Sequence, residues 1–159
     1  DFLINLRSLN LEDNLLTAAG CAELFSTLPH CPALEELAMS SNSVERSLIN
    51  LADSLPNLIK LVWLALSDCS LDYDHGFAQL VDRLLDSTSL RAIHLADNRG
   101  IGSGGVQELL QRLAHSRIED SLFIDMRNCC EVGSDPAAEL GIETTSGRTV
   151  KIGGSVVLV

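Results

Sequence analysis

The residues most suggestive of chemistry form a glycine pattern in the second half of the chain. Gly100, Gly102 and Gly105 have the G-x-G-x-x-G spacing of dinucleotide-binding loops, and Asp125 follows Gly105 by 20 residues. The surroundings argue against that chemistry. Residues 97–99 separate the preceding strand motif from the first glycine, so the tight strand-to-helix turn is missing. We therefore expect a Gly-rich loop and no cofactor.

Hydrolytic and metal chemistry need clusters that the sequence does not offer. Its histidines occupy unrelated positions without a GxSxG or HExxH context: His30, His75, His94 and His115. The cysteines include no CxxC pair and no Cys/His cluster at zinc spacing: Cys21, Cys31, Cys69, Cys129 and Cys130. We expect no catalytic residue, no metal and no enzyme activity.

Composition narrows the class of protein further. Apolar residues make up 46% of the 159 residues but aromatic residues only 4%, so leucine and valine must fill the core. The net charge of −11 opposes nucleic-acid binding. The sequence shows no apolar run of membrane-spanning length and no signal peptide. With an odd cysteine count and no Asn-x-Ser/Thr acceptor, it favours a cytoplasmic, reducing location.

A repeat of 27–29 residues organises the chain. Its strand motif, L-x-x-L-x-L-x-x-N/C, starts at Leu6, Leu34, Leu61, Leu90 and, in weaker form, Ser121. An insertion near residues 117–120 lengthens the last step, and Ile118 competes as the start of that motif.

The period-two core of the motif fits a short strand with one buried face. Asn14, Asn42, Cys69, Asn98 and Cys129 fill the slot that follows. Such side chains can bond to the backbone where the chain leaves the strand. We expect a structural ladder along the repeats, with Cys69 and Cys129 packed in the core.

The second half of each repeat has the i, i+3, i+4 spacing of a helix. The predicted apolar stripes are Gly20, Leu24, Phe25 and Leu28; Leu48, Leu51 and Leu55; Gly76, Leu80, Val81 and Leu84; and Val106, Leu109, Leu110 and Leu113. Pro29 and Pro56 should stop two of these helices. A strand and then a helix in every repeat predicts parallel strands joined by right-handed crossovers.

These motifs resemble the leucine-rich-repeat family, specifically its ribonuclease-inhibitor-like class. The resemblance implies an α/β right-handed solenoid with strands on the concave face and helices on the convex face. It covers residues 1–133. We expect residues 134–159 to cap the last repeat with a short helix over 135–140 and a hairpin formed by 148–152 and 155–159. A last helix leucine precedes the next strand motif by six residues, and none precedes Leu6, so we expect a fragment of a longer solenoid.

The concave strand face is the expected binding surface for a partner protein. In-register strands would stack two outward rows: Ser8, Glu36, Trp63, Ala92 and Phe123; and Asn10, Ala38, Ala65, His94 and Asp125. We expect the small alanines to leave the Trp63 ring uncovered. Aromatic Trp63 and Phe123, surrounded by Glu36, His94 and Asp125, would then form a hot spot with a polar rim.

Two alternative functions share this fold. The Ran GTPase-activating proteins have the same repeat class, and Arg99 and Arg127 are candidates for assisting a partner's active site by position only. The chain could instead be a structural subunit of a large multiprotein assembly.

The predicted compartment makes the redox state of the cysteines testable. Cys69 and Cys129 should lie two repeats apart, roughly 10 Å along the stack, beyond the reach of a disulfide. Thiol titration under denaturing, non-reducing conditions should give five free thiols. A lower count would contradict the reducing assignment.

Overall fold

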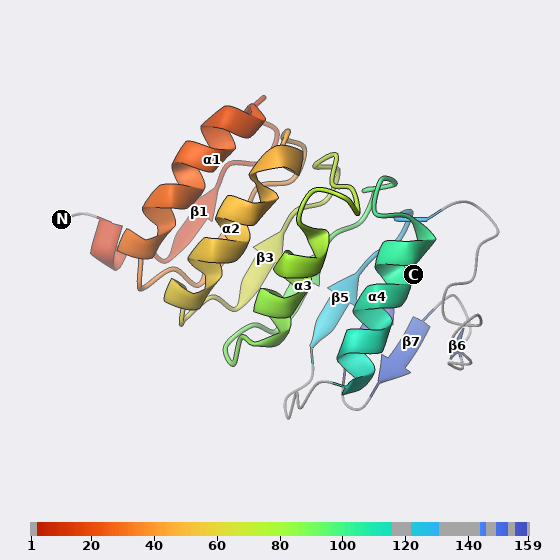
Figure 1. Cartoon of the computed structure of the whole chain (residues 1–159). Coiled ribbons are helices and arrows are strands. Elements are labelled where there is room, and N and C mark those ends of the chain that lie inside the picture. Colours follow the sequence, from red (N-terminus) through yellow and green to blue (C-terminus); the bar gives the residue numbers. More distant parts are fainter. Residues whose placement is uncertain (1–2, 116–121, 131–143, 146–148, 153–154, 159) are drawn as a thin grey trace.

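Parallel strands form one layer of the molecule and helices form the other (Figure 1). The computed structural model describes residues 3–115, 122–130, 144–145, 149–152 and 155–158. Its repeat strands are β1 (Ser8–Asn10), β2 (Glu36–Ala38), β3 (Trp63–Ala65), β4 (Ala92–His94) and β5 (Phe123–Asp125). They lie side by side in chain order, and every pair is parallel.

The helices all cover the same face of the sheet (Figure 1). They are α1 (Ala18–Thr27), α2 (Leu48–Ser54), α3 (Phe77–Leu85) and α4 (Gly102–His115), with short 3-10 helices η1 (Leu3–Asn5), η2 (Leu28–His30), η3 (Glu45–Ser47) and η4 (Leu55–Asn57). We call the opposite face of the sheet the open face. The predicted α/β leucine-rich-repeat solenoid is confirmed.

The core lies between the two layers and is built mainly from aliphatic side chains. The central residues of β2 to β5, Leu37, Leu64, Ile93 and Ile124, are fully buried. Period-two alternation sends these residues toward the helices and their neighbours toward the open face. Burying such side chains is the main force that holds one repeat against the next.

Two helix predictions need correction at the first residue of the stripe. Gly20 is exposed, and Cys21 occupies the buried position of α1 instead. Gly76 precedes α3 as its N-cap, with a left-handed φ of 94°. The two prolines lie in η2 and η4, directly after α1 and α2.

Each chain segment leaves its strand through a residue in the left-handed conformation. Asp13, Ser41, Asp68, Asp97 and Asn128 occupy the same slot of successive repeats, with φ between 52° and 64°. In the first four of these, the backbone N–H donates to a carbonyl of the next repeat at 2.8–3.0 Å. Asp and Asn tolerate this conformation better than most residues, which explains their recurrence in the slot.

The predicted ladder is present, and its asparagines are almost fully buried. Asn98 Oδ1 accepts from the backbone N–H groups of Cys69 and Leu71 at 2.9 and 3.0 Å. Its Nδ2 donates to the carbonyls of Leu66 and Leu95 at 2.8 and 2.7 Å. One side chain therefore satisfies backbone groups of two adjacent repeats.

Asn42 repeats this arrangement one step earlier, but Asn14 does not. The Asn42 amide bonds to the backbone of Leu11, Leu16 and Met39. Asn14 is exposed, and among the described residues its side chain donates only to the nearby Glu12 carbonyl. The reason is that β1 lies at the edge of the described sheet.

Cysteine replaces asparagine at two positions of the ladder, and each thiol still donates to a backbone carbonyl of the preceding repeat. The Cys69 and Cys129 thiols donate to the carbonyls of Met39 and Leu95 at 3.3 and 3.0 Å. Both are fully buried, which confirms their predicted core packing. Burial raises the pKa of each thiol to about 12, so both stay protonated donors at neutral pH.

The last strands extend the sheet beyond β5. They are β6 (Thr144–Thr145), β7 (Thr149–Ile152) and β8 (Ser155–Leu158), and β7 pairs antiparallel with both of the others. β8 runs parallel to β5, and its Val157 is fully buried opposite Ile124. The helix expected over 135–140 lies outside the described residues.

The ladder predicts unequal costs for the same substitution. Asn98→Ala leaves buried backbone donors and acceptors without partners, so it should lower the free energy of unfolding by about 3 kcal/mol. Urea denaturation monitored by circular dichroism measures this change. Asn14→Ala is the matched control and should cost less than about 1 kcal/mol. Equal costs at the two positions would contradict the ladder.

Candidate protein-binding face

The two outward rows predicted for the open face exist in the expected register. Along one row the paired residues are Ser8, Glu36, Trp63, Ala92 and Phe123; along the other they are Asn10, Ala38, Ala65, His94 and Asp125. The strands are only three residues long, so their short, parallel pairing brings side chains from five repeats onto one surface.

Aromatic side chains from three strands form a continuous cluster on this face. The Trp63 and His94 ring centroids lie 5.5 Å apart, and the His94 and Phe123 centroids are also 5.5 Å apart. Both pairs are tilted by 52–53°, within the range of favourable ring contacts. The imidazole therefore bridges the two larger rings across the sheet.

The prediction that the Trp63 ring is uncovered was wrong in part. Trp63 is half-buried, because its ring contacts His94 on the neighbouring strand. Ala92, its direct partner on β4, is too small to shield the rest of the ring. Trp63, His94 and Phe123 all remain partly exposed.

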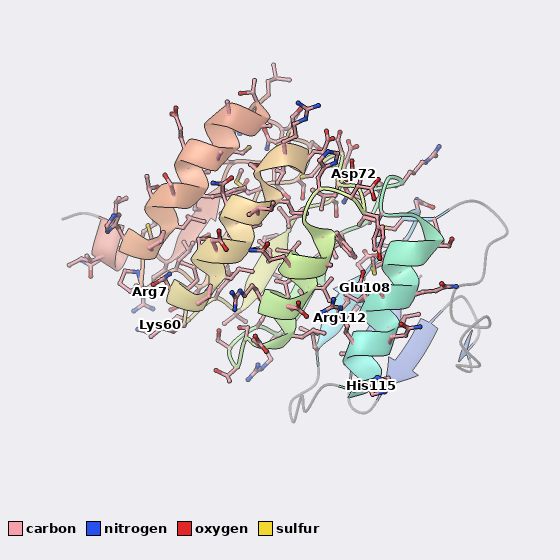
Figure 2. The ribbon with its side chains drawn as sticks, viewed as in Figure 1. Arg7, Lys60, Asp72, Glu108, Arg112 and His115 are labelled. Carbon is pink, nitrogen blue, oxygen red and sulfur yellow. The ribbon has the colours of Figure 1, made fainter. Side chains whose placement is uncertain are left out.

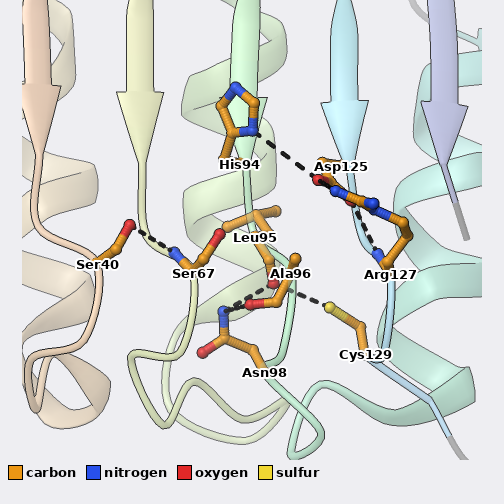
Figure 3. Close-up of polar contacts among 9 residues, drawn as sticks. All are labelled: Ser40, Ser67, His94, Leu95, Ala96, Asn98, Asp125, Arg127 and Cys129. Carbon is orange, nitrogen blue, oxygen red and sulfur yellow. Dashed lines mark hydrogen bonds and ion pairs between the residues drawn. The ribbon is translucent and has the colours of Figure 1, made fainter.

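Asp125 is not part of an accessible rim, contrary to expectation. It is only 3% exposed. Arg127 donates hydrogen bonds to the Asp125 carboxylate from Nε at 2.9 Å and from Nη2 at 2.6 Å, and the Arg127 backbone N–H donates a third at 3.2 Å (Figure 3). His94 Nδ1 lies 3.9 Å from the same carboxylate. Asp125 thus fixes the position of Arg127 through hydrogen bonds, and the exposed charged group at this point of the face is the guanidinium of Arg127.

The ionisation of Asp125 follows from these contacts. Burial by itself would raise the pKa of its carboxyl group, but the Arg127 hydrogen bonds and charge, with a smaller effect of His94, leave that pKa below its usual value. The carboxylate therefore stays charged at neutral pH and holds Arg127 over the end of β5.

The charged side chains on the open face differ in sign between the β1 end and the β5 end of the sheet. Glu36 is exposed and accepts a hydrogen bond from the Ser8 hydroxyl at 3.0 Å. Arg127 has a side chain that is 63% exposed. The aromatic cluster thus has an acidic group toward β1 and a basic group toward β5. In the sequence, Arg127 could have been assigned to this face because it lies two residues after Asp125.

Gly100 and Gly105 of the glycine pattern have a packing role. A Cβ at Gly100 would lie 2.7 Å from the Leu71 carbonyl oxygen and 2.8 Å from the Asp72 Cβ, so only glycine allows this close approach. At Gly105 a Cβ would meet the Ile101 side chain at 2.5 Å. The absence of a side chain at Gly100 thus allows the loops of two adjacent repeats to form the bridge between Asp72 and Gly100.

Comparisons with known proteins agree with this architecture. Residues 86–110 match a family model described as a leucine-rich repeat. Over 112 residues the chain is 34% identical to the ribonuclease inhibitor of Mus musculus. This match covers 68% of the chain and 24% of the inhibitor, so the chain spans about a quarter of that relative's length.

The chain belongs to the leucine-rich-repeat family and to its ribonuclease-inhibitor-like class. Repeat solenoids of this kind present extended surfaces that suit the binding of other proteins. Within the described part of the chain, no helix combines the length and the apolar character needed to span a membrane.

The pair of Asp125 and Arg127 predicts acid-sensitive stability. The pKa of the Asp125 carboxyl group is lower in the folded protein than in the unfolded chain, where it is about 3.9. The ion pair therefore contributes its full stability above the unfolded-state pKa, and this stability is lost as the pH falls through the folded-state pKa. Asp125→Asn should cost about 1.5–3 kcal/mol at pH 7 and flatten the loss of stability below about pH 4. Denaturation between pH 2 and pH 7 tests this, with Glu23→Gln on α1 as an exposed control. Parallel curves for wild type and Asp125→Asn would contradict the assignment.

Proposed function

We propose that this chain is a protein-interaction module that binds a partner protein through the open face of its sheet. The aromatic cluster of Trp63, His94 and Phe123 carries the proposal. It lies on the face that the helices leave uncovered, and its rings keep part of their apolar surface exposed.

The cluster has the composition of an interface hot spot. Tryptophan and arginine are enriched among residues that dominate binding free energy, and both are present here as Trp63 and Arg127. The ring contacts with His94 restrict Trp63 before any partner arrives, which reduces the entropy lost on binding. Glu36 gives the partner an exposed acidic charge to match, whereas the Arg127 guanidinium already forms an ion pair with Asp125.

The regulatory alternative gains no support from the arginines. A residue that assists a partner's active site must extend its guanidinium toward that site. The Arg127 guanidinium is bound to Asp125. Arg99 lines a hollow at the loop edge among acidic residues. Nor does a specific contact favour the structural-subunit alternative.

A cytoplasmic, reducing location is part of the proposal. All five cysteines are free thiols, and four of them are buried. Burial raises the pKa of each of these four thiols, and buried, protonated thiols without disulfides are typical of proteins in a reducing compartment.

Removing the Trp63 ring should weaken binding much more than folding. We expect Trp63→Ala to raise the dissociation constant about 30-fold, equivalent to about 2 kcal/mol. The lost contact with His94 should cost folding only about 1 kcal/mol. Quantitative affinity capture from cell extract identifies partners, and titration calorimetry with the purified partner measures the change.

Matched variants separate a binding role from a structural one. Ile59→Ala removes an apolar side chain that is 69% exposed but lies outside both rows, so the affinity should not change. Glu36→Lys reverses the charge on the strand position directly beside Trp63 and should also weaken binding. Normal binding by Trp63→Ala, combined with a much lower melting temperature, would make Trp63 a purely structural residue.

A further inference from the structure

A second cluster of functional side chains lies away from the open face, in the loops that lead from strands to helices. Glu45, at the start of η3, belongs to the second repeat, whereas Asp72 and His75 precede α3 in the third. One donor atom from each of these three residues lies within 4.8 Å of the other two. We propose that Glu45, Asp72 and His75 form a binding site for a divalent transition-metal ion, with zinc as the best fit.

The distances match a set of ligands around one ion. His75 Nδ1 lies 2.6 and 2.7 Å from the two Asp72 carboxylate oxygens and 3.6 Å from Glu45 Oε1. Ligand atoms about 2.1 Å from a tetrahedral zinc are roughly 3.4 Å apart. A small rotation of the His75 side chain would therefore open the site enough for an ion.

Asp72 is held in place before an ion binds. Its Oδ1 accepts the His75 backbone N–H at 2.9 Å, and its backbone forms a parallel bridge with Gly100. The close approach allowed by Gly100 fixes this bridge. The Asp72 carboxylate is therefore held facing the imidazole of His75.

The surroundings attract a cation and leave room for one. Glu45 and Asp72 face an open hollow that is also lined by Asp68 and Asp97, with Arg99 as the one cation among its lining residues. The His75 side chain is 47% exposed, so water can reach the site and complete the coordination. Field lines from clustered carboxylates raise the local concentration of cations.

The chemical types of the three proposed ligands favour some metal ions over others. One imidazole with two carboxylates suits zinc and neighbouring transition metals, whereas calcium prefers oxygen ligands only. A bound ion would tie the loop of one repeat to the loop of the next.

Zinc titration of the chelator-treated chain tests this site. At pH 7.5, competition with a chromophoric chelator should show one zinc bound per chain. His75→Ala and Asp72→Asn should each weaken zinc binding at least tenfold, because even the loss of a residue that only supports a ligand typically costs about 10–100-fold. The amide oxygen that Asp72→Asn introduces would still accept the His75 N–H, so the loop turn is kept. Excess calcium should not displace the zinc.

Controls exclude other ligands. His115 lies at the far end of α4 from Asp72 (Figure 2), and His115→Ala should bind zinc like wild type. The cobalt-substituted protein should show d–d absorption without a thiolate charge-transfer band, because the half-buried Cys130 is not a ligand. A thiolate band, wild-type affinity in His75→Ala, or no saturable zinc binding up to about 1 mM would each overturn the proposal.

Discussion

The buried asparagine amide is the interaction on which the rest of this structure depends. Every repeat must turn sharply off a three-residue strand, and the turn leaves backbone donors and acceptors inside the molecule. Asn42 and Asn98 satisfy those groups for their own repeat and for the one before. A solenoid without such a residue would bury unpaired peptide groups at each turn, at a cost that its short strands could not offset.

This constraint also sets the regular spacing of the open face. Because hydrogen bonds join each turn to the turn of the next repeat, the register of the strands is fixed. Residues at the same position of the motif therefore lie side by side. Trp63, His94 and Phe123 meet because the register is kept across β3, β4 and β5. The same packing that stabilises the stack thus fixes the distances within the proposed binding cluster.

Both candidate sites draw their residues from neighbouring repeats and not from one sequence motif. His94 and Asp125 meet from β4 and β5, and Glu45 meets His75 across the loops of adjacent repeats. In a solenoid, residues about one period apart become close neighbours. Functional sites in such a chain are therefore found by comparing equal positions along the repeats. A search for compact motifs would miss them.

The sequence by itself determined the strands, the order of the helices, the ladder and the two outward rows. These features follow from local periodicities of 2 and 3.6 residues and from the repeat length, which one chain displays directly. The burial of Asp125, the partial cover of Trp63 and the meeting of Glu45 with His75 were decided only by the tertiary structure. They depend on which way each side chain turns among neighbours that lie about 30 residues away, and the pattern of a single repeat holds no information about those neighbours.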